Sequence, residues 1–152
     1  MLNDLILQFG YFGLFVISFL SATLVPLASE VFVVAMPALN YNSWLILVSA
    51  TAGSFLGSLT NYYVGKKGTD FILGRYIRIN EKTWQRAERF YERWGAITLF
   101  FSWVPFIGDP LTVVAGAFNI SLRLFTFWVL LGKTLRYLVL LGIANRIINY
   151  LA

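Results

Sequence analysis

The chain has 152 residues, of which 59% are hydrophobic and only 12% are charged. Soluble domains carry about 25% charged residues, so this composition predicts an integral membrane protein. There is no cysteine and no histidine, which excludes disulfides, thiolate chemistry, metal or haem ligation by these residues and imidazole catalysis. The net charge of +5 is better explained by cytoplasmic loops and anionic lipid headgroups than by nucleic acid, and we expect neither a cofactor nor an enzyme.

The first apolar block runs from Leu5 to Leu39 and is interrupted by Pro26 and Pro37. Glu30 is the one charged residue between positions 5 and 64. A proline disturbs a helix, and an ionised carboxylate at bilayer depth costs roughly 2.5–3.5 kcal/mol on insertion scales. Each feature therefore needs either a structural partner or a functional role, and a harmless helix kink is the alternative for the proline.

A polar turn at residues 40–43 leads to a second span, Trp44 to Gly65. Gly53 and Gly57 lie on one face of this span, where small residues allow close packing of helices. Asn61 follows one turn later. Its amide could hydrogen-bond across that helix contact or line a cavity.

The segment that follows is basic, with eight lysines and arginines against four acids from Lys66 to Arg93. The positive-inside rule places this linker, residues 66–94, in the cytoplasm. Asn80 is the expected N-cap of an amphipathic helix that anchors the protein at the headgroups. The apolar face of this helix is formed by Trp84, Ala87, Tyr91 and Trp94.

The third apolar block, Gly95 to Phe118, contains a single charge, Asp109. Three residues in it oppose a continuous helix: Pro105, Gly108 and Pro110. A turn at residues 119–121 precedes the final span, which is predicted to run from Leu122 to about Ala144.

The two halves of the chain share one order of features, namely a proline, an acid, Val-Val-Ala, a polar turn, a glycine, a polar residue and a tyrosine. This order predicts an internal repeat within a single membrane domain, residues 1–152. Its halves are residues 5–65 and 95–150.

Two architectures can hold irregular backbone at membrane depth, because such backbone must be buried in protein or line a wet cavity. Each broken block either crosses as a kinked helix or returns as a re-entrant hairpin. We expect the second, which gives an all-α inverted repeat of hairpin plus spanning helix. If the basic linker is inside, kinked spans put both termini in the cytoplasm, whereas hairpins put both outside.

The acids Glu30 and Asp109 have few counterparts at depth, and the obvious ones are Lys133 and Arg136, one turn apart on the last span. We predict that these four residues, with Asn61, bind the substrate or a proton. A purely structural salt-bridge network is the alternative.

These residues resemble the DedA family, also called the VTT or SNARE-associated domain, and within it the short YqaA-like subgroup. The resemblance covers nearly the whole chain. It is carried by Leu24-Val25-Pro26 with Ser29-Glu30, Gly53-Ser54-Phe55-Leu56-Gly57, Phe100-Phe101-Ser102-Trp103-Val104-Pro105, Gly108-Asp109 and Gly132-Lys133-Thr134-Leu135-Arg136-Tyr137.

The resemblance implies two facing re-entrant hairpins and a role in moving lipids, including undecaprenyl phosphate and phospholipids, often with dependence on the proton gradient. Glu30 falls on the family's acid after the first proline. The family's hairpin arginines are replaced by Ser102 and Gly108, and an acid of its glycine-rich span by Ser58. A phosphate site built on those arginines therefore cannot be carried over.

Our leading hypothesis is an inner-membrane transporter or scramblase-like protein for a lipid or lipid-linked anion, with protons as the candidate coupling ion. Membrane lipids are its expected partners, and a homo-oligomer is compatible with the sequence. The alternatives are a structural or assembly factor of a membrane complex and a small-ion carrier.

Overall fold

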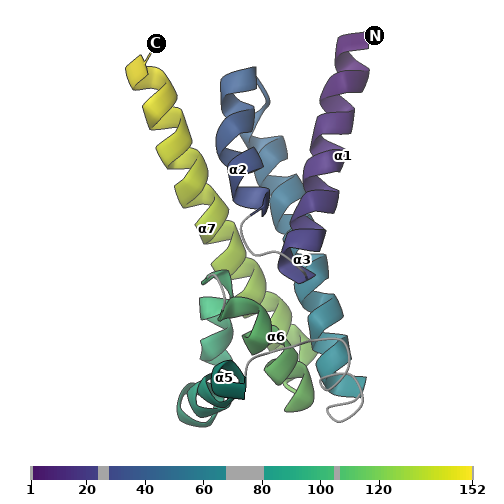
Figure 1. Cartoon of the computed structure of the whole chain (residues 1–152), viewed down its shortest axis with the longest axis vertical. Helices are drawn as coiled ribbons and strands as arrows, with labels where there is room; N and C mark the ends of the chain where they lie inside the picture. The colour runs from purple at the N-terminus through teal and green to yellow at the C-terminus, as the bar shows by residue number, and fades with distance from the viewer. Residues whose placement is uncertain (1, 24–27, 68–80, 105–106, 152) are drawn as a thin grey trace. The chain divides into compact units, whose positions relative to one another are not determined.

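The computed structural model describes residues 2–23, 28–67, 81–104 and 107–151, which form helices without any strand (Figure 1). Within the described residues, two helices are long and apolar enough to cross a membrane, α3 (Ser43–Lys67) and α7 (Leu122–Leu151). At 1.5 Å per residue they measure about 37 and 45 Å, against a hydrocarbon core of about 30 Å. The prediction of an all-α integral membrane protein is confirmed at this level.

The remaining elements are shorter. Three of them precede α3 and three lie between α3 and α7. They are α1 (Leu2–Thr23), α2 (Ala28–Ala35), η1 (Met36–Leu39), α5 (Glu81–Trp94), η2 (Gly95–Trp103) and α6 (Gly108–Ala117). The last helix, α7, is longer than predicted and continues beyond Ala144 to Leu151. Neither proline nor glycine occurs between these two positions to end it.

The chain divides into two compact units. Unit 1 comprises Met1–Gly57 and Lys133–Ala152, and unit 2 comprises Ser58–Gly132. Each unit therefore contains a helix segment from the opposite half of the chain, the C-terminal part of α7 in unit 1 and the C-terminal part of α3 in unit 2. The predicted division into two half-repeats and a linker stays a prediction.

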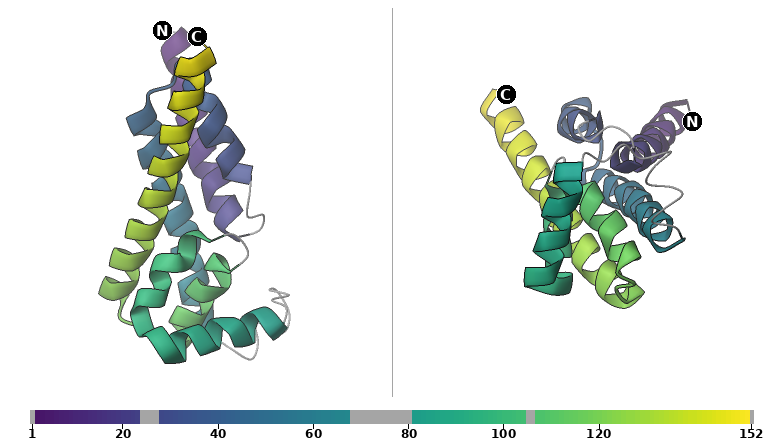
Figure 2. Two further views of the ribbon diagram at one scale, coloured as in Figure 1. Left: turned by 90° about the vertical axis from the view of Figure 1, so that its left-hand side faces the viewer. Right: turned by 60° about the horizontal axis from the view of Figure 1, so that its bottom comes forward.

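In unit 1, α1 and α2 pack together and run in opposite directions (Figures 1 and 2). The apolar core joins them to α3 and α7 through Leu14, Val33, Met36, Ile46, Leu47, Ala50, Tyr137 and Leu141. A Cβ atom at Gly53 would collide with the carbonyl oxygen of Phe15, and one at Gly57 with Ala22. The predicted close packing at these two glycines is confirmed.

In unit 2, the C-terminal part of α3 packs against α6 with no room for side chains between the backbones. A Cβ at Gly65 would collide with the Val113 carbonyl, and one at Gly116 with the Tyr62 carbonyl. The hydroxyl of Tyr62 donates a 2.6 Å hydrogen bond to the carbonyl oxygen of Ile120.

The two polar turns that precede α3 and α7 have the same geometry. Asn40 and Asn119 adopt left-handed conformations, with φ of 63° and 53°. In each turn the asparagine N–H bonds the carbonyl three residues back, and the next N–H bonds the carbonyl five residues before it. This is the Schellman arrangement that satisfies the last carbonyls of a helix.

The predicted helix-breaking residues have different outcomes. Pro26, Pro105 and the expected N-cap Asn80 lie outside the described residues. Pro110 lies in the first turn of α6, where a proline is tolerated because its missing N–H would be unbonded anyway. Gly108 opens the same helix, and any Cβ there would collide with the carbonyl of Ser102.

Candidate functional site

In unit 1, a carboxylate from α2 meets a guanidinium from α7. The Oε1 atom of Glu30 forms an ion pair with Nη2 of Arg136, and the side chains are 23% and 17% exposed. Glu30 lies in the first turn of its helix, where the unbonded N–H groups favour a negative charge. The structure therefore brings together two of the five predicted site residues, an acid from the first broken segment and a base from the last span.

Hydroxyl groups adjoin both members of this pair. The Oγ of Ser29 donates to Oγ of Ser21 at 3.4 Å, and the Tyr137 hydroxyl lies 3.3 Å from the same Ser29 Oγ. Either hydroxyl can be the donor in the bond between Ser29 and Tyr137. A buried chain of three hydroxyls thus includes the sequence neighbours of both members of the ion pair, Ser29 and Tyr137.

Lys133 lies one turn before Arg136 on α7 and is almost fully buried, with 3% exposure. Its Nζ donates to the backbone carbonyl of Ser54 at 2.9 Å and to Ser54 Oγ at 2.6 Å. A buried ammonium needs such acceptors, because its loss of hydration is otherwise uncompensated. A second cation is therefore held in the same unit as the Glu30–Arg136 pair.

Two further buried hydroxyls of unit 1, those of Ser18 in α1 and Thr51 in α3, have no hydrogen-bond partner in the described part of the chain. Buried polar groups are normally bonded to protein or to ordered water. These two hydroxyls are available to water or to an oxygen of a substrate.

The other two predicted site residues, Asp109 and Asn61, belong to unit 2. Asp109 lies in the first turn of α6, and its backbone carbonyl accepts a 2.7 Å hydrogen bond from the Thr112 hydroxyl. Asn61 is buried in α3 with 7% exposure. The five predicted residues are thus divided, three in unit 1 and two in unit 2.

Four residues of this site are not predicted by the sequence: Ser21, Ser29, Ser54 and Tyr137. Three of them are small hydroxyl residues within apolar segments, and that is the only signal the sequence gives. Tyr137 is the tyrosine of the predicted repeat, a pattern that does not indicate its hydrogen bond to Ser29. Among the described residues, no group of three or more aspartate or glutamate side chains could hold a metal ion.

Comparison with known proteins gives one family match, to the model described as VTT domain, over residues 25–146. Inner membrane protein YqaA of Escherichia coli is 43% identical over 129 residues, which are 83% of this chain and 84% of that protein. An uncharacterized Haemophilus influenzae protein is 36% identical over 140 residues, covering 87% of this chain and 85% of that protein.

A more distant relative is undecaprenyl phosphate transporter A of Staphylococcus aureus, 26% identical over 155 residues, which cover 93% of this chain and 76% of that protein. No solved structure matches the chain.

Proposed function

Since the chain belongs to the VTT domain family of inner membrane proteins, also called the DedA family, we propose that it moves a lipid or lipid-linked anion across the membrane. The proposed cargo is a phospholipid or a polyprenyl phosphate, in keeping with the name of the S. aureus relative. Transport of this kind makes and breaks no covalent bond, so no enzymatic activity is part of the proposal.

The observation that carries the proposal is the Glu30–Arg136 ion pair, with buried Lys133 one turn away. A phosphate group needs cationic donors, and the planar guanidinium of arginine binds its oxygens in pairs. While no substrate is bound, the Glu30 carboxylate neutralises Arg136. A bound phosphate takes over Arg136, and Glu30 accepts a proton, which links substrate binding to proton uptake.

The broken segments support a re-entrant arrangement of this site. After the breaks, α2 and η1 together reach about 20 Å and α6 about 15 Å, too short to cross a hydrocarbon core of about 30 Å, whereas α1 before the first break reaches about 33 Å. The matching asparagine turns before α3 and α7, with the equal spacing of Glu30 to Asp109 and Asn40 to Asn119, support an inverted repeat. In this arrangement Asp109 and Asn61 serve the second half of the substrate path.

Topology tests the hairpins separately from transport. With residues 66–94 in the cytoplasm, re-entrant hairpins place both termini outside. A reporter fused after Ala152 should therefore be inactive if it requires the cytoplasm and active if it requires the periplasm. The opposite result would favour kinked spanning helices.

Transport is tested in proteoliposomes that contain fluorescent phospholipids or a polyprenyl phosphate. Glu30→Gln and Arg136→Gln should abolish translocation while the protein still inserts and elutes as a single species. Glu81→Gln and Arg123→Gln are the matched controls, because both residues are exposed and belong to unit 2, whereas the ion pair belongs to unit 1. If both single variants, Glu30→Gln and Arg136→Gln, translocate lipid at the native rate, the proposed site is contradicted.

Two other outcomes would replace the proposal. Copurifying proteins without any flux by the isolated chain would indicate an assembly factor. A flux of small ions that does not respond to lipid headgroup would indicate an ion carrier.

A further inference from the structure

The charges of α5 are separated by sign around the helix. Its bases recur at spacings of four, three and four residues, which places them along one stripe: Lys82, Arg86, Arg89 and Arg93. Its acids are spaced seven and four residues apart on a different stripe: Glu81, Glu88 and Glu92. Helices that lie on water alone gain from mixing the two signs, so this separation indicates an anionic partner along one stripe.

A buried tyrosine fixes which way α5 is turned. Tyr91 is 7% exposed, its hydroxyl donates to the Leu111 carbonyl at 3.1 Å, and its ring stacks on that of Phe118. Burial raises the pKa of this phenol, so it stays a neutral donor. The Thr98 hydroxyl also donates to the Phe90 carbonyl at 3.2 Å and ties α5 to η2. Because Tyr91 is held inward, the stripe of basic residues is exposed, and we call its members Arg86, Arg89 and Arg93 the arginine stripe.

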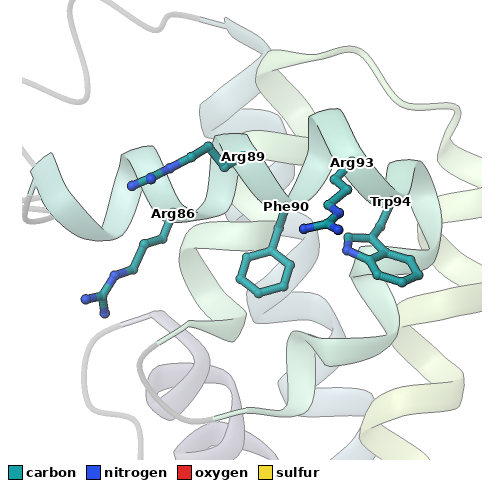
Figure 3. A pocket seen from close by; sticks show the side chains of 5 residues that line it. All are labelled: Arg86, Arg89, Phe90, Arg93 and Trp94. Carbon is teal, nitrogen blue, oxygen red and sulfur yellow. The ribbon is translucent and has the colours of Figure 1, made fainter.

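The arginine stripe borders an open pocket of about 520 Å³. It is lined by Arg86, Arg89, Phe90, Arg93 and Trp94. Figure 3 shows Arg86, Phe90, Arg93 and Trp94 projecting from one side of α5, with the Arg93 guanidinium beside the Trp94 indole. Arg89 lies back along the helix, and its Nε donates to the Gln85 carbonyl at 3.2 Å.

We propose that this pocket binds the phosphate of an anionic lipid headgroup in the leaflet next to α5, with the glycerol and first acyl carbons against Phe90 and Trp94. Three guanidinium groups supply forked donors for phosphate oxygens. The site involves none of the residues assigned to transport, and the inference holds whether or not the chain translocates lipid.

The aromatic side chains favour a lipid over a free phosphate ion. Phe90 and Trp94 are 45% and 59% exposed, an arrangement typical of the boundary between headgroups and acyl chains. The segment that follows α5 continues this exposed apolar surface through Ile97 and Phe101, both 46% exposed. A free anion makes no apolar contact with these side chains, whereas the acyl chains of a lipid bury their exposed surface.

The test is a titration of the detergent-solubilised full chain with short-chain phosphatidic acid, followed by native mass spectrometry. Parallel titrations use short-chain phosphatidylcholine and inorganic phosphate. We expect phosphatidic acid to bind, the zwitterionic lipid to bind much more weakly, and inorganic phosphate to compete only at far higher concentration. Equal binding of phosphate and phosphatidic acid would show a site for the free anion and overturn the lipid assignment.

Two triple variants locate the site. Arg86→Gln, Arg89→Gln and Arg93→Gln together should weaken phosphatidic acid binding by about tenfold or more. Lys66→Gln, Lys67→Gln and Arg123→Gln remove the same charge from exposed positions of the same unit and should leave binding nearly unchanged. Equal loss in the two variants would mean general charge attraction and contradict the pocket.

A third triple variant, Arg86→Lys, Arg89→Lys and Arg93→Lys, keeps the charge and removes the forked donors. It should bind phosphatidic acid more weakly than the native chain and more tightly than the glutamine variant. All three arginines are exposed, so helicity by circular dichroism should be unchanged and will show that the fold survives.

Discussion

Tyr62 and Tyr137 stand five residues after Gly57 and Gly132 in the two halves of the chain, but they bond to different kinds of partner. Tyr62, in unit 2, donates to a backbone carbonyl in the turn before α7. Tyr137, in unit 1, bonds the hydroxyl of Ser29, the neighbour of Glu30. Tyrosines at matching positions of the predicted repeat therefore have different partners, a backbone carbonyl in unit 2 and the hydroxyl of the residue before Glu30 in unit 1.

The same contrast extends through the two units. Both units contain close backbone approaches at glycines. Unit 1 adds an ion pair, a buried lysine and a chain of buried hydroxyls, whereas unit 2 adds tyrosine bonds to carbonyls, Asp109 and the exposed arginines of α5. Charged side chains can exchange partners with a ligand, while backbone contacts cannot. This difference favours unit 1 as the place where substrate oxygen atoms replace protein ones.

The largest expected effect comes from breaking the ion pair of unit 1. Glu30→Gln leaves Arg136 without its counter-charge and should lower the free energy of unfolding by about 3–5 kcal/mol. The double variant, in which Arg136→Gln is added, should lose less in total than Glu30→Gln alone. Thermal unfolding in detergent measures the coupling between the two changes. Strict additivity of the two losses would show that the pair is not coupled, and the contrast between units would fail.

Close packing in unit 2 gives the next effect. Gly65→Ala or Gly116→Ala places a methyl group against a carbonyl and should destabilise the protein by about 1–3 kcal/mol. Gly13→Ala and Gly142→Ala are matched controls in helices where a Cβ meets nothing within 4 Å, and they should be neutral or stabilising. If all four variants behave alike, the glycines of unit 2 are not structural contacts.

The two tyrosines provide a direct comparison at smaller cost. Tyr62→Phe and Tyr137→Phe each remove a buried hydroxyl and should cost about 1 kcal/mol in stability. Only Tyr137→Phe should also slow lipid translocation in proteoliposomes, because its hydroxyl adjoins the Glu30–Arg136 pair. Equal translocation rates in the two variants would remove the functional distinction between these positions.

The smallest expected effect concerns the two asparagine turns, which have the same geometry in the two halves of the chain. Asn40→Ala and Asn119→Ala each force an alanine into the left-handed conformation and should each cost about 1 kcal/mol. Asn40→Gly and Asn119→Gly should be close to neutral, because glycine adopts that conformation freely. Clearly different losses at the two turns would show that their common geometry does not reflect a common stability.

The sequence predicted those features that depend on long or local patterns. Apolar length located α3 and α7, and the polar turns preceded both helices where they were expected. The scarcity of charges in apolar segments limited the expected partners of Glu30 and Asp109 to Lys133 and Arg136, and the structure pairs Glu30 with Arg136. These patterns are readable because few other residues could satisfy the same requirement.

Other contacts could not be predicted. They join helices that are far apart in the sequence, and they depend on how each helix is shifted along its axis and rotated about it. Lys133 bonds the backbone and hydroxyl of Ser54, one of many serines in the sequence that could have served. The nine-residue 3₁₀ helix η2 is also unexpected, since such runs seldom exceed three or four residues and carry no clear residue signature.

The C-terminal part of α7 belongs to unit 1, so this unit contains residues that are synthesised early and residues that are synthesised late. About a hundred residues separate Glu30 from Arg136, and at roughly 5–20 residues per second a ribosome needs roughly 5–20 s to synthesise them. During that interval Glu30 lacks the counter-charge of Arg136, and an ionised carboxylate without a partner is costly in a hydrocarbon core. Unit 2 ends at Gly132, so all its residues are synthesised before Lys133 and the other residues that α7 contributes to unit 1.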